Sequence, residues 1–195
     1  MATVTALRAR PNGRVAVDLD GGPWRTLPAE PVVRAGLAVG LELDRERARQ
    51  LRRELRRAEA LAVATRALGR RELSSRGLAE RLDRAAVRPR ERDAVLETVA
   101  RAGLVDDVRF AAGRAYALAE RGYGDAAIAS DLERRGIPPK ARHDALAGLR
   151  PEPERAAEIT ARRGAGQRTA RFLAAKGFGE EAVEAASGAD FANGP

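Results

Sequence analysis

The sequence predicts a mainly α-helical protein built from tandem three-helix repeats, with a small β-rich cap at the N-terminus. Of its 195 residues, 42 are Ala and only 4% are aromatic, so the core must consist of Ala, Leu and Val, which favours closely packed helices. From residue 45 onward one apolar pattern returns at fixed offsets, as in repeat proteins. Residues 1–44 instead alternate between apolar and polar side chains, which indicates strands.

The N-terminal region begins with two alternating stretches separated by Asn12-Gly13, a strong turn signal, and we therefore expect a β-hairpin. Asp44 is placed to cap a long helix that begins at Arg45. A region of this size cannot hold a hydrophobic core alone. The expected elements are strands at Val4–Ala9, Arg14–Leu19 and Trp24–Leu27 and a short helix at Val32–Leu37.

The rest of the chain repeats itself at the level of single residues. Ala86, Gly136 and Gly177 close the second helix of each unit, and Pro89 and Pro139 open the third. One such unit cannot bury its own apolar face, so we expect the three to stack into an elongated, curved array. Leu68, Leu78, Leu82 and Val87 recur 50 residues later as Leu118, Ile128, Leu132 and Ile137, and 41 residues after that as Ile159, Thr169, Leu173 and Phe178.

These boundaries divide the chain into five parts. The expected parts are a hairpin-containing region (1–44), a long basic helix with repeat 1 (45–104), repeat 2 (105–149), repeat 3 (150–187) and a flexible tail (188–195).

The positive charge is concentrated in one of these parts. The net charge of the chain is +8, and residues 45–104 carry a net +8 while the other parts nearly balance. Only Lys140 and Lys176 among the 36 basic residues are Lys, and a guanidinium can meet phosphate or carboxylate with two parallel hydrogen bonds. This distribution points to polyanions or acidic protein surfaces as partners.

The strongest functional signal is the helix that begins at Arg45. Residues 45–57 include seven Arg and two Glu, and the stripe at i, i+4, i+7 and i+11 consists of Arg45, Arg49, Arg52 and Arg56. Adjacent like charges destabilise a helix slightly, which favours an anion opposite them. The alternative is a well-solvated face with Leu51 and Leu55 buried behind it. Arg66, Arg70, Arg71 and Arg76 extend the basic run into repeat 1.

The composition argues against most enzymes and metal sites. With no Cys and one His, the chain cannot form a disulfide, a thiolate nucleophile, a Cys-ligated zinc site or a His-rich metal site. No apolar run approaches the roughly 18 residues of a membrane span, and Met1–Arg10 lacks the apolar core of a signal peptide. We expect a cytoplasmic protein without membrane contact, cofactor, metal or catalytic activity.

Repeat 2 opens with two adjacent carboxylates. Asp106 is placed to cap a helix, Asp107 adds negative charge to its first turn, and Val105 and Phe110 have the spacing of a hydrophobic staple. The alternative, metal or acid-base chemistry, lacks a further carboxylate, His or phosphate-binding loop. Tyr123 between two glycines anchors a turn or, alternatively, stacks on a base or a partner side chain. We expect His143 at the surface and an interhelix turn at Gly164–Gly166.

Three motifs follow one another in repeat 2: LVDDVRFA at 104–111, RGYG at 121–124 and RGI at 135–137. With their spacing they closely resemble the RecX family of recombinase regulators, over about residues 60–149 and more faintly to residue 178. The resemblance implies tandem three-helix repeats that bind the RecA recombinase, lodge in the groove of its filaments on single-stranded DNA, and restrain ATP hydrolysis and strand exchange. Gly77, Arg114, Asp125 and Ala127 depart from the family pattern.

The resulting functional expectation is an inhibitory regulator of RecA filaments in DNA repair and recombination, which binds single-stranded DNA weakly and without sequence specificity. The alternative is a general nucleic-acid-binding helical repeat protein without a specific recombinase partner. The candidate contact residues are Arg45, Arg49, Arg52, Arg56, Arg66, Arg70, Arg71, Arg76, Arg121, Tyr123, Arg134 and Arg135.

Overall fold

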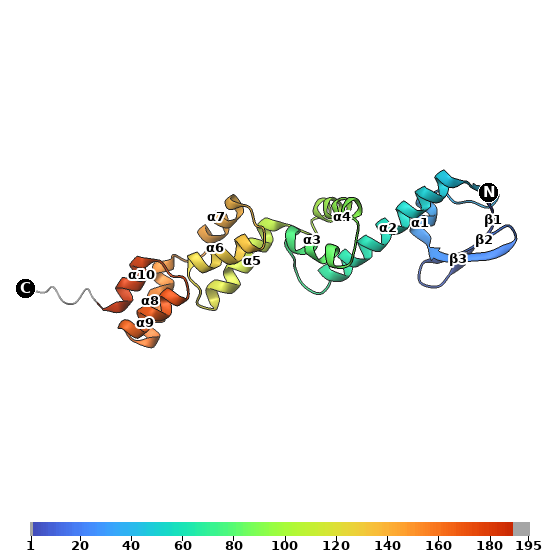
Figure 1. The fold of residues 1–195 in the computed structure, drawn as a ribbon. Helices are drawn as coiled ribbons and strands as arrows, with labels where there is room; N and C mark the ends of the chain where they lie inside the picture. The colour runs from blue at the N-terminus through green and yellow to red at the C-terminus, as the bar shows by residue number, and fades with distance from the viewer. Residues whose placement is uncertain (1, 189–195) are drawn as a thin grey trace, which may run out of the picture. The chain divides into compact units, whose positions relative to one another are not determined.

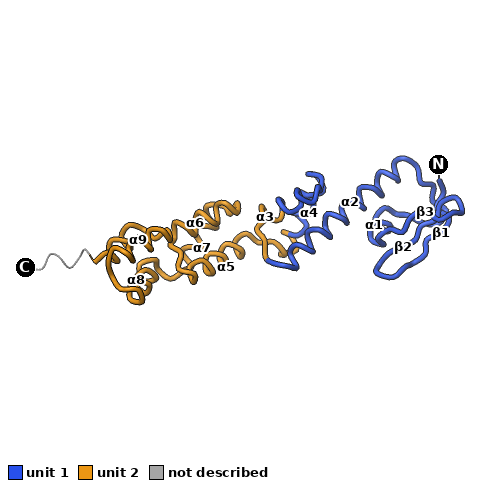
Figure 2. Tube along the Cα trace, turned by 60° about the horizontal axis from the view of Figure 1, so that its bottom comes forward, with its two compact units in different colours: residues 1–71, 79–99 blue, residues 72–78, 100–195 orange. Residues whose placement is uncertain are grey.

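The computed structural model describes residues 2–188, which form four strands and ten helices (Figure 1). The expected tail at 188–195 lies outside these residues apart from Gly188. The chain divides into two compact units (Figure 2). Unit 1 comprises Met1–Arg71 and Ala79–Val99, and unit 2 comprises Glu72–Leu78 and Ala100–Pro195.

The N-terminal strands form one antiparallel sheet in the order β3-β2-β1-β4 (Figure 1). Asn12 and Gly13, with φ of 61° and 65°, form the turn of the expected hairpin. The third strand is longer than expected, and the fourth, which pairs with Ala2 and Thr3, was not predicted. The strands are β1 (Ala2–Arg10), β2 (Arg14–Leu19), β3 (Gly22–Pro28) and β4 (Glu42–Leu43).

Helix α1 (Ala29–Arg34) begins three residues before the predicted helix at Val32–Leu37. Gly36, with φ of 66°, ends the turn that follows it, so the chain cannot continue as a helix to Leu37. The buried cluster under the sheet includes Val4, Val17, Leu27 and Val32, and it is completed by Leu51 of the next helix. The N-terminal region thus shares its core with α2, as its small size requires.

Unit 1 also contains α2 (Arg45–Leu68), α4 (Pro89–Arg101) and most of α3 (Ser75–Arg84). Asp44 caps α2, because its side chain accepts a 2.8 Å hydrogen bond from the backbone N–H of Arg47. Pro89 opens α4 as predicted. Leu82 of α3 and Val95 of α4 are among the fully buried side chains.

Unit 2 contains two further groups of three helices, each around its own buried cluster. Leu132 and Leu173, the predicted equivalents of Leu82, are both fully buried. The first group is α5 (Asp107–Glu120), α6 (Asp125–Arg134) and α7 (Pro139–Ala147), and the second is α8 (Glu152–Arg163), α9 (Gln167–Ala175) and α10 (Glu180–Ser187).

Within unit 2, the second helices of successive repeats meet end to end. The end of α6 touches the segment that starts α3, where the Ser74 hydroxyl donates to the Arg135 carbonyl at 2.9 Å. The end of α9 touches the start of α6 in the same way, since the Gly124 N–H donates to the Lys176 carbonyl at 2.9 Å. A carboxylate at the first residue of the first helix of the next repeat caps each of these helix starts. Asp107 of α5 accepts from Ser75 N–H at 2.8 Å, and Glu152 of α8 accepts from Asp125 N–H at 2.5 Å.

The two predicted cap glycines make these contacts possible. Gly136 and Gly177 have φ of 75° and 79°, which L side chains rarely adopt. A Cβ at Gly136 would lie 2.8 Å from the Cβ of Arg76, and one at Gly177 would lie 2.6 Å from the Cβ of Ala127. Both positions therefore need Gly for conformation and for space.

Candidate partner-binding face

Helix α2 presents the predicted stripe of arginines on one face. We call Arg45, Arg49 and Arg52, which are all exposed, the arginine face. Arg52 Nε donates a 3.0 Å hydrogen bond to the carbonyl of Ala48 within the same helix. Within residues 2–188 none of the three forms an ion pair, so their charges are available to an external anion.

Arg56 continues the stripe but has a carboxylate partner. Its Nε lies 2.9 Å from the Glu91 carboxylate of α4, and the Glu91 side chain is only 12% exposed. The hydrogen bond from Arg56 holds the pKa of Glu91 below its ordinary value. Glu59 lies three residues along α2 from Arg56, but the packing of α4 beside α2 supplies Glu91 as the partner.

The next candidates lie at and after the end of α2. Arg66 is in its last turn, and Arg70 and Arg71 follow it; all three are exposed and form no ion pair among the described residues. Arg76 differs because its aliphatic stem packs on Gly136 in unit 2. The structure therefore gives Arg76 a packing role beside any contact with a partner.

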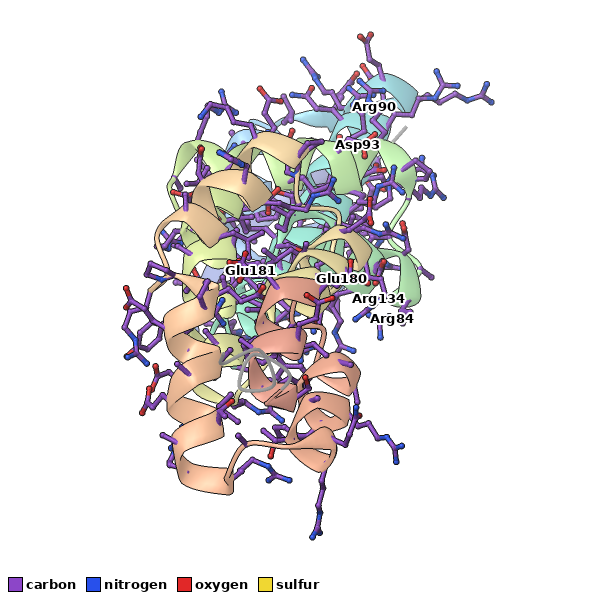
Figure 3. The ribbon with its side chains drawn as sticks, turned by 90° about the vertical axis from the view of Figure 1, so that its left-hand side faces the viewer. Arg84, Arg90, Asp93, Arg134, Glu180 and Glu181 are labelled. Atoms are coloured by element: carbon purple, nitrogen blue, oxygen red, sulfur yellow. The ribbon has the colours of Figure 1, made fainter. Side chains whose placement is uncertain are left out.

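The basic candidates of repeat 2 surround one carboxylate. Asp131 accepts two hydrogen bonds from Arg114, at 2.9 and 3.1 Å, and two from Arg135, at 2.8 and 3.4 Å. These partners, Arg114 first, hold the pKa of Asp131 well below its ordinary value of 3.8. Arg134 is 3.7 Å from the same carboxylate and donates a 2.8 Å hydrogen bond to the Ser130 hydroxyl, and its side chain, labelled in Figure 3, is 69% exposed. Arg121 is exposed at the end of α5.

Tyr123 is half-buried and packs against the core of α5, α6 and α7. The Lys176 ammonium lies 4.0 Å from the centre of its ring, and the Tyr123 carbonyl accepts a 2.9 Å hydrogen bond from Arg155. These contacts fit the anchoring interpretation better than base stacking, because a ring engaged by core residues and by Lys176 is less open to a nucleotide.

Sequence reasoning missed Arg155, a charged residue that is only 6% exposed. Its guanidinium pairs with the Asp125 carboxylate and donates to the carbonyls of Tyr123 and Arg150. Burial raises the pKa of Asp125, and the charge of Arg155 opposes that effect. No spacing in the sequence marks Arg155, because two of its partners, Tyr123 and Asp125, are 32 and 30 residues away in the chain.

The two carboxylates that open α5 have structural roles. Asp106 accepts from the N–H groups of Val108 and Arg109 at 2.9 and 3.0 Å, which lowers its pKa, and it is the expected N-cap. Asp107 does more than predicted, since it also caps the segment that starts α3. Among residues 2–188, no group of three His, Cys, Asp or Glu side chains is placed to hold a metal ion, and no helix is both long and apolar enough to cross a membrane.

Comparison with known proteins identifies the family. No family model matches the sequence. Two solved structures have the same fold: the crystal structure of a regulatory protein RecX has a TM-score of 0.81, 21% identity, and covers 94% of this chain and 98% of its own. RecX from Lactobacillus salivarius has a TM-score of 0.58 and 15% identity, and covers 67% of this chain and 94% of its own.

A curated relative is more similar in sequence. Regulatory protein RecX from Halorhodospira halophila (strain DSM 244 / SL1) is 37% identical over 137 residues, which are 65% of this chain and 85% of the relative. With this identity over most of the relative's length, the chain belongs to the RecX family of regulatory proteins.

Proposed function

We propose that this protein is a non-enzymatic regulator that binds RecA filaments on single-stranded DNA and inhibits their ATP hydrolysis and strand exchange. Membership of the RecX family supports a regulatory role. The arginine face is the observation that best supports electrostatic binding to such a filament. Its residues Arg45, Arg49 and Arg52 are exposed and form no ion pair among residues 2–188.

Electrostatics explains why such a face favours this class of partner. Like charges one turn apart on a helix repel by a few tenths of a kcal/mol per pair, so the face is mildly unfavourable in the free protein. A nucleoprotein filament supplies phosphates and acidic side chains along its length. Long-range attraction to such a polyanion raises the association rate, and this effect weakens with salt.

The same observation supports a second candidate, a general nucleic-acid-binding protein. Arginines that meet phosphates without reading bases give weak, salt-sensitive binding with little sequence dependence. Under our proposal such DNA contacts accompany the RecA contacts and do not replace them.

Titration of RecA's DNA-dependent ATPase distinguishes the two. A filament regulator slows ATP hydrolysis when it is at or below the concentration of RecA. A DNA binder slows it only when there is enough protein to coat the DNA, and its effect disappears when excess free single-stranded DNA is added. Inhibition that follows the ratio of protein to DNA, whatever the RecA concentration, would contradict the proposal.

A further inference from the structure

Unit 1 contains an open groove of about 440 Å³ between α2, the end of α3 and the start of α4. Its walls combine small apolar side chains with arginines and glutamates. The side chains that matter below are Arg56, Glu59, Ala62, Arg66, Ala86 and Arg88.

Ala86 of this groove is equivalent to the two cap glycines on which helix starts pack in unit 2. By the repeat offset it occupies the position of Gly136 and Gly177, and its φ of 56° is left-handed like theirs. Each of those glycines is covered by the first turn of a helix, through Arg76 or Ala127. Ala86 is exposed, because the residues before α2 form a sheet and not another three-helix repeat.

The chemistry of the covered contacts shows what such a surface accepts. In both, the covering segment is the N-terminal turn of a helix that brings backbone N–H groups to the surface. Gly124 N–H meets a carbonyl at the end of α9, and Ser75 and Asp125 N–H groups meet carboxylates. By the same offset, the equivalent acceptor in the groove is the carbonyl of Ala85, since the carbonyls of Arg81, Leu82 and Asp83 already accept backbone hydrogen bonds.

Charge then selects the kind of helix. Arg66 and Arg88 are exposed and form no ion pair among residues 2–188, while Arg56 is already paired with Glu91. Glu59 offsets one of the two unpaired cations, so the groove keeps a positive charge. Helix first turns are enriched in Asp and Glu, which the arginines of the groove would complement.

We propose that this groove binds the acidic N-terminal turn of a helix on a partner protein. The inference rests on the proposed function, under which that helix belongs to RecA. The arginine face leads into the groove, because Arg45, Arg49, Arg52 and Arg56 share one stripe of α2 with the groove residues that follow.

A second copy of this chain is the less suitable occupant. The helix start that would correspond to the covering turns is that of α9, and it carries Arg168 next to Arg163. Bringing these cations to Arg66 and Arg88 would place like charges together.

Site-specific crosslinking tests the proposal, since the chain contains no Cys and each variant has a single reactive thiol. A photocrosslinker attached to the thiol of Ala62→Cys lies in the groove. The same label on Ala117→Cys lies on the exposed side of α5 and serves as a control. On RecA filaments the label at residue 62 is expected to crosslink to the RecA polypeptide, and the label at residue 117 is not.

Charge reversal provides a second readout. Arg66→Glu with Arg88→Glu should weaken crosslinking and ATPase inhibition by roughly tenfold, as expected for two exposed pairs turned into repulsions. The matched control is Arg168→Glu with Arg171→Glu, which makes the same change in net charge on α9 and should leave both unchanged. Circular dichroism and urea unfolding verify that every variant folds.

The possible failures are distinguishable. If the parent inhibits RecA but residue 62 crosslinks to DNA or to nothing, the groove is not a protein-docking site and the proposed function stands. If charge reversal in the groove leaves inhibition unchanged, the inference is also overturned. If the parent neither binds nor inhibits RecA filaments, the proposed function and the inference both fail.

Discussion

Replacing Arg45, Arg49 and Arg52 with Glu should abolish regulation while leaving the fold intact. The three side chains are exposed and form no ion pair within residues 2–188, and the contact that the substitutions remove from α2 is the exposed hydrogen bond from Arg52 Nε to the Ala48 carbonyl. Surface substitutions of this kind change the free energy of unfolding by about 0.5 kcal/mol or less each. A carboxylate at residue 45 even lies in the first turn, where the helix dipole favours it.

Arg56 must be left unchanged in this variant, although it belongs to the same stripe. Its partner Glu91 is only 12% exposed, and Arg56→Glu would place a second carboxylate beside it. Loss of the partner of a mostly buried acceptor costs about 1–3 kcal/mol, so Arg56→Glu alone should be destabilising. Substitution of Arg56 should therefore lower the free energy of unfolding, whereas substitution of the other three arginines should affect only binding.

The assay combines urea unfolding with inhibition of RecA ATP hydrolysis at several ionic strengths. The triple variant should unfold at nearly the urea concentration of the parent and lose inhibition most strongly at low salt, where the Debye length exceeds about 10 Å. If it folds normally and inhibits as well as the parent, the arginine face is only a solvated surface. The binding face would then lie near Arg121 and Arg134.

Three further predictions concern stability. Leu132→Ala should lower the free energy of unfolding by about 2–5 kcal/mol in urea titration, because the side chain is fully buried; a cost below about 1 kcal/mol would contradict its place in the core. Ala86→Gly should raise the free energy of unfolding by up to about 1 kcal/mol, because Ala is strained at a φ of 56° and Gly is not; a loss of stability would show that the strain is absent. The pKa of Asp131 is lowered in the folded state, so its contribution to stability is complete above the unfolded pKa of about 4 and is lost as the pH falls below that value. In Asp131→Asn the free energy of unfolding should therefore fall less steeply as the pH is lowered below about 4 than it does in the parent. An equally steep fall in urea titrations at acid pH would refute this.

Local patterns predicted much of this fold from sequence. One recurring apolar pattern predicted the cap glycines Gly136 and Gly177 and the equal burial of Leu82, Leu132 and Leu173. The pattern recurs because each unit must bury the same face of its second helix and end that helix in the same way. The two-residue strand β4 was missed because its pairing with β1 depends on residues 40 positions apart, which no local pattern records.

The candidate face was predicted less completely, because charge pairing depends on tertiary packing. Arg45, Arg49 and Arg52 could be read from helical spacing, while the partner of Arg56 comes from a helix 35 residues away. Arg114, which departs from the family pattern, is explained only by its two hydrogen bonds to Asp131.

The groove was also beyond sequence reasoning. Arg88 was not among the candidates, since it precedes Pro89 and belongs to no stripe. Arg88 matters because it lies in the groove beside Ala86. Ala86 has the left-handed φ of Gly136 and Gly177, but no helix start packs on it as on those two glycines.

The most direct test of binding to RecA filaments is a pull-down of RecA by the purified protein, with and without single-stranded DNA, at near-physiological salt. We predict that RecA assembled on single-stranded DNA is retained, and that DNA of the same length without RecA is retained only weakly, with a loss that steepens as salt rises. Equal retention of the DNA with and without RecA, or no retention of RecA filaments, would contradict a regulator that binds these filaments.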